Sequence, residues 1–386
     1  MGTVVVLAMG VAAIVFLHPA DQDLDAGDLV ARGVWHPMAA SDLAGRSSPS
    51  VVWTRKAMIV WGGTGDTGVL GDGASYDLSS DTWTLLPPAP LSPRTGHTAV
   101  WTGDRMLVWG GSGVREGCEG LCPLADGAAY DPGSKTWTPL APAPIGPRSG
   151  HTAVFVQNRM VVWGGAGEGG AALADGASFD AEANSWTVLP PAPVGPRVSH
   201  RAAATTDRML LWGGSSEAVE GGLYLDDGAV YNTLTGAWAL MAAGPASLAA
   251  RDTFAGVWTG RQLLVWGGYG RSDACTPCLR ADGAAYDPDT DSWTPMAPSP
   301  LSGRGGQRAV WTGRDMLVWG GFDTAVEGDG ALYNPVDDSW VLLPPVPLHP
   351  RQLHAMVWTG RQLLVWGGAG ADGRLADGAV LTLDAA

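Results

Sequence analysis

Charge is scarce in this sequence, and positive charge is the scarcer of the two signs. Of 386 residues only 16% are charged, with 23 Lys and Arg against 38 Asp and Glu and a formal net charge of −15. Nucleic-acid binding requires a basic surface that releases counterions, so the composition argues against a nucleic-acid partner and against docking on anionic membranes. The negative charge itself keeps a folded protein soluble.

Long apolar runs are also missing, apart from residues 4–17 near the N-terminus. A helix of this length rises about 21 Å, which is too short to cross a hydrocarbon core of roughly 30 Å. The run fits the hydrophobic region of a secretory signal, with Ala20 before the cleavage point, although no Lys or Arg precedes it and His18 departs from the small-residue pattern. We therefore expect residues 1–20 to be a signal peptide or a short N-terminal hydrophobic segment, with no further membrane insertion, and residues 21–30 to be a linker.

Glycine, proline and tryptophan are abundant instead, with 56, 28 and 19 residues respectively. Together they indicate many short strands joined by tight turns. An apolar content of 46% argues against disorder, because enough side chains are present to form a core. The composition therefore favours a globular all-β protein.

A repeat runs through most of the chain. The triplet Trp-Gly-Gly occurs seven times, beginning at Trp61, Trp109, Trp163, Trp212, Trp266, Trp319 and Trp366. An arginine stands fifteen residues before each triplet, at Arg46, Arg94, Arg148, Arg197, Arg251, Arg304 and Arg351. An Asp-Gly pair follows each triplet after a variable gap, at Asp72, Asp126, Asp175, Asp227, Asp282, Asp329 and Asp377. A spacing that never changes indicates paired strands, because one inserted residue would turn every later side chain to the other face.

Each repeat is expected to form four strands, a to d in chain order. The segment from Arg94 to Trp109 holds two apolar runs around a turn, which predicts strands a and b. The segment from Asp282 to Trp293 holds two more, which predicts strands c and d. We expect each repeat arginine to begin strand a and each Asp-Gly aspartate to begin strand c. Repeats of four short strands are typical of β-propeller blades, with the recurring tryptophans filling the space between them.

The seventh repeat ends after its third strand, and a segment near the N-terminus resembles the missing fourth. Residues 35–39 match residues 293–297, and Trp35 precedes Arg46 by the usual eleven residues. We therefore predict that residues 31–386 form a single seven-bladed β-propeller, whose ring is closed when the N-terminal strand completes blade seven. Closure of this kind removes exposed sheet edges.

These motifs resemble those of the Kelch-repeat β-propellers, and of their bacterial members in particular. The shared features are a Gly-Gly that ends a strand, then a tyrosine such as Tyr76, then a tryptophan such as Trp83 at a short fixed spacing. The resemblance implies that ligands bind on the face that carries the b–c and d–a loops. It does not imply one chemistry, because Kelch-like propellers include a copper oxidase of galactose, a sialic-acid mutarotase and many modules that only bind peptides or proteins.

The seven repeat arginines are the first candidates for ligand binding. They are expected at one mouth of the central channel, where unpaired guanidinium groups would bind carboxylates through two hydrogen bonds each. The seven Asp-Gly aspartates are expected on the same face, about 9.6 Å away. The arginines and aspartates would then form a repeated structural ion pair, which we favour because a motif present in every blade is usually architectural.

Histidines and loops supply further candidates. His97, His151, His200 and His354 each follow a repeat arginine by three residues and would either bind a metal or, as we favour, contact a neighbouring blade. The b–c loops are longest in blades two, four and five, and insertions on one face commonly carry specificity. The blade-four loop contains the candidate ligand-binding residues Glu217, Glu220 and Tyr224.

All four cysteines lie in the long loops of blades two and five. Blades two and five are expected on nearly opposite sides of the ring, too far apart for one zinc ion to bind all four sulfurs. We predict two local disulfides, Cys118–Cys122 and Cys275–Cys278, which leave no cysteine for a copper oxidase of the galactose type. Disulfides and a signal peptide indicate a secreted or cell-envelope protein, with a cytoplasmic location as the alternative. We expect no cofactor and no metal.

The uniform repeat favours a non-catalytic binding or scaffold module, because an active site usually introduces acids, bases or nucleophiles into a few repeats. The expected partner is an unknown protein, or a carbohydrate or anionic small molecule, bound on the b–c and d–a loop face. The alternative is a sugar-acid-processing enzyme that resembles the sialic-acid mutarotase. It would use channel arginines for the carboxylate and Glu217 or Glu220 as acid and base.

Overall fold

The computed structural model describes residues 31, 33–217, 222–272 and 275–383. Within these residues, seven antiparallel sheets contain four strands each, and the only helix is a 3-10 turn, η2 (Glu168–Gly170). The predicted signal peptide and linker, which together cover residues 1–30, lie outside the described residues, as does Glu220. In the described part of the chain, no helix has the length and apolar character needed to cross a bilayer.

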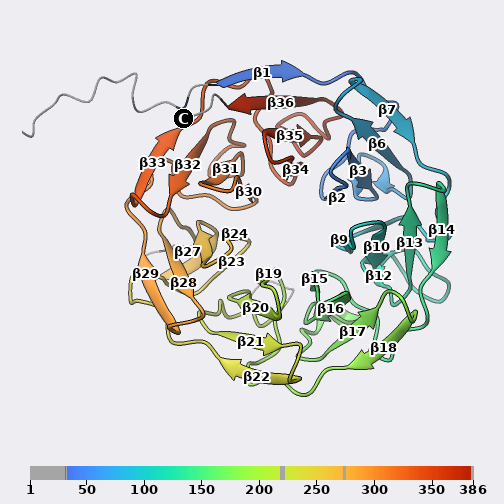
Figure 1. Cartoon of the computed structure of the whole chain (residues 1–386), viewed down its shortest axis with the longest axis horizontal. Helices are drawn as coiled ribbons and strands as arrows, with labels where there is room; N and C mark the ends of the chain where they lie inside the picture. The colour runs from blue at the N-terminus through green and yellow to red at the C-terminus, as the bar shows by residue number, and fades with distance from the viewer. Residues whose placement is uncertain (1–30, 32, 218–221, 273–274, 384–386) are drawn as a thin grey trace, which may run out of the picture.

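In six of the sheets the strands follow one another in chain order from the innermost to the outermost, and in the seventh the outermost strand comes from the N-terminus (Figure 1). The first four sheets consist of β2 (Ser50–Trp53), β3 (Ala57–Trp61), β6 (Gly73–Asp77) and β7 (Thr82–Leu85); β9 (Thr98–Trp101), β10 (Met106–Trp109), β13 (Gly127–Asp131) and β14 (Thr136–Pro139); β15 (Thr152–Val156), β16 (Arg159–Trp163), β17 (Gly176–Asp180) and β18 (Ser185–Val188); and β19 (Arg201–Ala204), β20 (Arg208–Trp212), β21 (Gly228–Asn232) and β22 (Ala237–Leu240). The other three consist of β24 (Ala255–Trp258), β25 (Leu263–Trp266), β28 (Gly283–Asp287) and β29 (Ser292–Pro295); β30 (Arg308–Trp311), β31 (Met316–Trp319), β32 (Gly330–Asn334) and β33 (Ser339–Leu342); and β34 (Ala355–Trp358), β35 (Gln362–Trp366), β36 (Gly378–Leu383) and β1 (Gly33–Pro37).

Shorter strands pair outside these sheets, in the b–c loops and in the linkers that lead to strand a. They are β4 (Thr64–Gly65) with β5 (Gly68–Val69); β8 (Arg94–Thr95) with β11 (Ser112–Gly113) and β12 (Cys122–Pro123); and β23 (Arg251–Asp252) with β26 (Tyr269–Ser272) and β27 (Cys275–Leu279). The d–a linkers therefore lie against the b–c loops on one face of the molecule.

The N-terminal strand β1 is the outermost strand of the last sheet. It runs antiparallel to β36, with Trp35 opposite Leu381. The Trp35 ring lies 6.3 Å from the Trp319 ring of the preceding sheet. Strand-d tryptophans elsewhere pack in the same way, as Trp186 does at 5.4 Å from Trp109.

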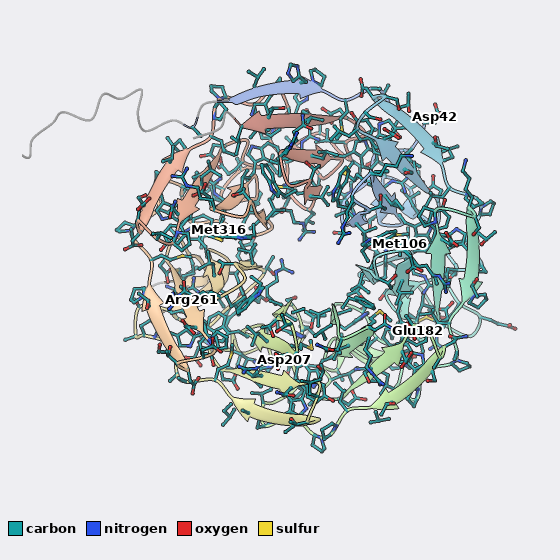
Figure 2. All side chains as sticks on the ribbon, viewed as in Figure 1. Asp42, Met106, Glu182, Asp207, Arg261 and Met316 are labelled. Atoms are coloured by element: carbon teal, nitrogen blue, oxygen red, sulfur yellow. A yellow bond between two sulfur atoms is a disulfide. The ribbon has the colours of Figure 1, made fainter. Side chains whose placement is uncertain are left out.

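The core lies between neighbouring sheets, where side chains fill the space (Figure 2). Met106 and Met316 are fully buried there, as are all seven tryptophans of the Trp-Gly-Gly triplets. Each triplet ring contacts the strand-d tryptophan of the next sheet, so every pair of neighbouring sheets is joined by two large rings. Burial of such rings is a main source of stability, at about 25 cal/mol per Å² of apolar surface.

The glycine that begins strand c is required by close packing. A Cβ atom on Gly127 would lie 2.5 Å from the carbonyl oxygen of Val108 and 2.8 Å from the Trp109 ring, in the neighbouring strand β10. Because any side chain would collide with this backbone, the Asp-Gly pair recurs in every repeat. The spacing between strands b and c at the tryptophan is thereby held constant.

The repeat arginines lie before strand a, which corrects the prediction that they begin it. Arg46 precedes the first residue of β2 by four positions, and Arg94 belongs to the separate strand β8. Two residues after each arginine the backbone φ is positive, for example 51° at Ser48 and 55° at Leu353. This turn separates the linker from strand a. The sequence does not predict it, because residues other than glycine rarely adopt a positive φ.

The same positive-φ residues connect neighbouring sheets around the centre. The backbone N–H of Ser48 donates to the carbonyl of Leu353 at 2.8 Å, and the N–H of Leu353 donates to Gly306 at 3.1 Å. Gly306 donates in turn to Thr253, and Thr253 to Ser199, both at 3.4 Å. The first sheet in the chain is therefore bonded directly to the last.

Candidate functional site

The repeat arginines lie on the loop face, which is the face that carries the b–c loops and the d–a linkers. Arg148 shows the arrangement of all seven, except that Arg304 has no hydrogen bond to the backbone carbonyl of Asp329. The Nη1 of Arg148 donates to the carbonyls of Gly164 and Asp175 at 3.1 and 3.0 Å, and its Nε donates to Gly146 at 3.1 Å. Its Nη2 donates to the Asp175 carboxylate at 3.0 Å. The guanidinium thus joins the d–a linker, the end of strand b and the start of strand c.

Each repeat arginine forms this ion pair with the aspartate of its own repeat, so the favoured structural arrangement is present. The Arg148 side chain is 1% exposed, whereas the Asp175 side chain is 51% exposed. An anion would have to displace the aspartate to reach the guanidinium. Ligand binding by the repeat arginines remains a prediction, and it requires that the ligand displace the paired aspartate. The residues concerned are Arg46, Arg94, Arg148, Arg197, Arg251, Arg304 and Arg351.

The four histidines predicted beside strand a each contact a tryptophan of a neighbouring sheet; His151, His200 and His354 are buried, and His97 is partly buried. The His97 ring lies edge-on to Trp61 at 5.1 Å, and Phe254 occupies the equivalent place against Trp212 at 5.3 Å. Burial and the charge of Arg94 lower the pKa of His97 to about 3, so its ring is neutral at physiological pH. Within the described residues, no three His, Cys, Asp or Glu side chains are grouped as metal ligands.

The start of the innermost strand departs from the repeat in blades four and six. The first residue of strand a is small in most repeats, as in Thr98 and Ala255, but it is Arg201 in β19 and Arg308 in β30. Nε of Arg201 donates to the carbonyl of Phe254 at 2.8 Å, and Nε of Arg308 donates to the carbonyl of His354 at 3.1 Å. Sequence reasoning missed both arginines, although comparison of this single position across the seven repeats distinguishes them.

Acidic and aromatic side chains lie beside Arg201. Asp252 is half-buried, and its burial raises the pKa of the carboxyl group, while hydrogen bonds with Thr253 and Ser215 and the charge of Arg201 oppose that rise. The charge of Asp252 in turn contributes to the raised pKa values of Tyr224 and Tyr269, after the larger effect of burial. The predicted residue Tyr224 therefore lies in this cluster.

The other predicted residues lie in the b–c loops. Glu217 is exposed on the blade-four loop. The structure pairs Cys118 with Cys122 and Cys275 with Cys278, as predicted. Each pair closes a turn within its own long loop on the loop face.

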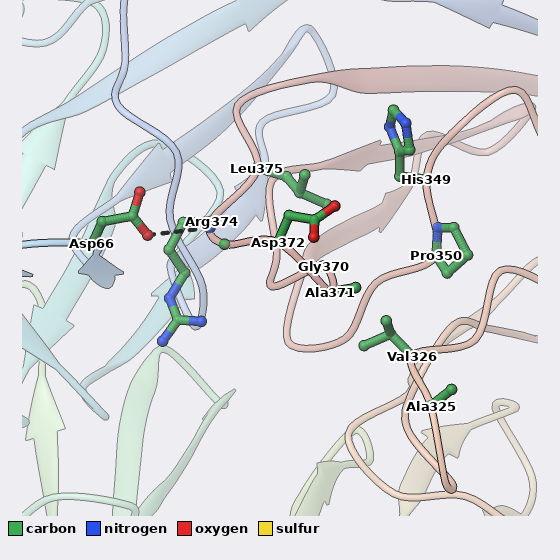
Figure 3. Close-up of a pocket in the computed structure, with 11 residues that line it drawn as sticks. Asp66, Ala325, Val326, His349, Pro350, Gly370, Ala371, Asp372, Arg374 and Leu375 are labelled. Atoms are coloured by element: carbon green, nitrogen blue, oxygen red, sulfur yellow. Dashed lines mark hydrogen bonds between the residues drawn. The ribbon is translucent and has the colours of Figure 1, made fainter.

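Two pockets lie on opposite faces of the molecule. On the loop face, a pocket of about 410 Å³ is lined by Val326, His349, Asp372 and Leu375, among others (Figure 3). Asp66 closes one side of it by accepting a hydrogen bond from the Arg374 N–H at 3.2 Å. On the opposite face, a polar pocket of about 330 Å³ is lined by residues including Thr205, Asp207, Arg208, Trp258 and Arg261.

The seven four-stranded antiparallel sheets of the described residues have the arrangement of β-propeller blades. The sequence model of the KLHDC2/KLHL20/DRC7 Kelch-repeats domain matches residues 150–368. Because this match covers more than half of the chain, the protein belongs to the Kelch-repeat family. Comparison with curated proteins gives no significant match.

Proposed function

We propose that this protein is a non-catalytic binding or scaffold module that contacts a partner protein through its b–c and d–a loops. One observation carries the proposal: all variation in loop length lies on the loop face. The b–c loops range from 7 residues in blade six to 14 in blade two, whereas the a–b and c–d hairpins keep a constant length. Variation confined to the loops of a rigid scaffold is typical of a recognition surface.

The proposed scaffold is a single domain of seven blades, residues 31–386, closed into a ring by β1. Support comes from the seven four-stranded sheets of the described residues, the pairing of β1 with β36, and the hydrogen bond from Ser48 to Leu353. In a closed ring the remaining sheet edges are the short outer and inner strands of each blade, which favours the loops as the contact surface for partners. We further propose a secreted or cell-envelope location, which the two disulfides support because such bonds persist in oxidising compartments.

The test compares matched variants on the two faces. The double variant Glu217→Lys with Tyr224→Ala alters the blade-four loop, and Glu182→Lys makes the same charge change on an exposed c–d hairpin of the opposite face (Figure 2). Proteins crosslinked to each form in the native cells are quantified by mass spectrometry. We expect a specific partner to be lost from the loop-face variant and retained by the hairpin variant. Equal capture by both variants would contradict the proposal.

The sugar-acid-processing alternative makes a different prediction. Wild-type protein incubated with sialic and uronic acids would interconvert or consume them, and the Glu217→Gln variant would not. We expect no turnover, because the seven repeat arginines are already engaged by carboxylates of the protein itself. Turnover by wild type that is lost in the variant would favour the enzyme.

A further inference from the structure

The polar pocket of about 330 Å³ lies between blades four and five, on the face opposite the loops. Blade four contributes Asp207 and Arg208 from its a–b hairpin. Blade five contributes Trp258 at the end of β24, Arg261 on its a–b hairpin and Asp289 on its c–d hairpin. Figure 2 labels Asp207 and Arg261, which belong to these neighbouring blades. The pocket is therefore separate from the surface proposed above to contact a partner protein.

The blade-four wall of this pocket departs from the arrangement in blade three. There, Arg159 begins strand b opposite Asp180, the last residue of strand c, and forms an ion pair with it at 3.3 Å. In blade four, Arg208 begins strand b, but the residue opposite it is the uncharged Asn232. The side-chain oxygen of Asn232 accepts hydrogen bonds from the backbone of the c–d turn. Arg208 therefore lacks the carboxylate that strand c supplies in blade three.

Arg208 instead reaches blade five. Its Nη1 donates to the carbonyl of Pro288 at 3.5 Å and lies 3.9 Å from the carboxylate of Asp289. Its Nε lies 3.7 Å from the carboxylate of Asp207, which also accepts a hydrogen bond from the Thr205 hydroxyl at 3.2 Å. A guanidinium carries five N–H donors, so these contacts leave donors for a ligand. Arg208 thus joins the two walls of the pocket.

The blade-four hairpin is held in position from the neighbouring blade. The side-chain amide of Gln157, in blade three, donates to the carbonyl of Thr206 at 2.7 Å. Within the hairpin, the N–H of Thr205 donates to the carbonyl of Arg208 at 2.9 Å. A wall that is already fixed loses little conformational freedom when a ligand binds, which favours affinity.

The lining offers hydrogen-bond donors and acceptors side by side. The side chain of Asp289 is 80% exposed and that of Arg261 is 78% exposed, while that of Arg208 is 33% exposed. The partly buried indole of Trp258 adds an apolar ring with an N–H donor at its edge. A ligand in the pocket would meet carboxylate acceptors, guanidinium donors and an aromatic ring.

Neither guanidinium of the pocket is a free positive charge. Arg208 lies within 4.0 Å of both Asp207 and Asp289, and Arg261 forms an ion pair with Asp287 at 3.2 Å. An anionic ligand would meet the carboxylates of the wall, and a cationic ligand would meet the two arginines. The pocket therefore favours an uncharged ligand that both donates and accepts hydrogen bonds.

We propose that this pocket binds a neutral carbohydrate, either a free sugar or the end of a longer chain. Each hydroxyl group of a sugar both donates and accepts, which suits aspartates that stand beside arginines. The C–H groups of a sugar ring are apolar and pack against an aromatic ring such as that of Trp258. The volume of about 330 Å³ is near the lower limit of the roughly 300–1,000 Å³ typical of small-molecule sites, which limits the bound part to one or two rings. The site goes beyond the proposed function, because it lies on the opposite face and shares no residue with the loops.

The test measures binding of glucose, galactose, mannose and N-acetylglucosamine to the full chain by ligand-observed NMR titration. The variants Arg208→Ala and Asp289→Ala remove a donor and an acceptor from the pocket. The matched control is Arg314→Ala, which removes an arginine that is 60% exposed from the a–b hairpin of blade six, on the same face. We expect wild type to bind at least one of the sugars saturably, each pocket variant to lower that affinity about tenfold or more, and the control to leave it unchanged. Methyl glycosides of the same sugars distinguish the two sources, because they bind if the natural ligand is the end of a chain, whereas the free sugars alone bind if it is a monosaccharide.

The absence of saturable binding for all four sugars would overturn the proposal, as would binding that survives in the Arg208→Ala and Asp289→Ala double variant. Glucuronate, the charged counterpart of glucose, should bind more weakly than the neutral sugars, because carboxylates line the wall. Stronger binding of glucuronate that is lost in Arg208→Ala would show an anion site instead.

Two further measurements keep the result independent of folding and of the loop face. Because the Asp289 side chain is exposed, its replacement should leave the melting temperature unchanged, and an unchanged sugar affinity in Asp289→Ala would refute the site even if Arg208→Ala failed to fold. The Glu217→Lys and Tyr224→Ala double variant should bind the sugar as wild type does, since both changes lie on the loop face. Loss of sugar binding in that variant would contradict the assignment to this pocket.

Discussion

Substitution of Arg148 tests the structural role of the repeated ion pair most directly. Arg148→Ala removes a buried guanidinium and leaves the carbonyl of Gly164 without its donor, while the Asp175 carbonyl loses one of two donors and still accepts from the Gly164 N–H at 3.1 Å. Each unsatisfied buried acceptor costs about 1–3 kcal/mol, and the aspartate also loses its partner. We therefore expect a loss of about 3–5 kcal/mol in the free energy of unfolding.

Asp175→Ala should be much less harmful. The Asp175 side chain is half-exposed, so water replaces part of the lost interaction, while Arg148 keeps its bonds to three backbone carbonyls. Removal of an exposed ion-pair partner costs about 0–1 kcal/mol, and the buried Arg148 charge that is left unpaired adds to this cost. We therefore expect Asp175→Ala to lower the free energy of unfolding by about 1–2 kcal/mol. The double variant should be less destabilised than the sum of the two single variants, because the pair can be lost only once.

Urea unfolding of the four proteins, followed by tryptophan fluorescence, measures these differences. If Arg148→Ala lost less than about 1 kcal/mol, or if Asp175→Ala lost as much as Arg148→Ala, the guanidinium would not be the anchor of its repeat. The matched control is Arg159→Ala, because Arg159 forms an ion pair with Asp180 at 3.3 Å but its side chain is 42% exposed. That variant should lose no more than about 1 kcal/mol.

Three further perturbations test other parts of the structure. Deletion of residues 1–40 removes β1 and the contact of Trp35 with Trp319, and we expect aggregation or a large loss of thermal stability, whereas deletion of residues 1–20 should leave the melting temperature unchanged. The two disulfides close only short loops, so reduction should lower the free energy of unfolding by on the order of 1–2 kcal/mol for each. Peptide mapping without reductant should recover both linkages. Four free thiols in protein from its own cells would contradict them. His97 has a pKa of about 3 in the folded protein and an ordinary pKa of about 6.5 in the unfolded chain, so the unfolded chain binds the proton more readily. The contribution of His97 to the free energy of unfolding should therefore be constant above pH 6.5. It should fall by about 1.4 kcal/mol per pH unit as the pH decreases from 6.5 towards 3. His97→Phe, which introduces the ring that blade five carries at Phe254, should reduce that slope, and an unchanged slope would show that His97 does not cause it.

The repeated parts of the fold were predictable because the same residue types recur at the same spacing in every repeat. Seven equal spacings identified the paired strands, and the match of residues 35–39 to a strand-d segment led to the prediction that β1 belongs to the last sheet, where it pairs with β36. The place of the arginines was mispredicted because positive φ at Ser48 and Leu353 has no signature in residue type. Arg201 and Arg308 were overlooked because the fit of such side chains depends on the neighbouring blade, where Gly256 leaves room for the stem of Arg201.

The arginine anchor also explains why the loop face can vary while the rest of the chain does not. Arg148 bonds to the carbonyl of Gly164, where strand b ends, and to Asp175, where strand c is about to begin. Both ends of the b–c loop are therefore held by one side chain, whatever lies between them. Loops of 7 to 14 residues can start and finish at the same two points without disturbing the sheets. An arginine that is buried and already paired is poorly suited to hold a ligand itself, so the recognition surface that we propose consists of the loops, which this arginine leaves free to differ from blade to blade.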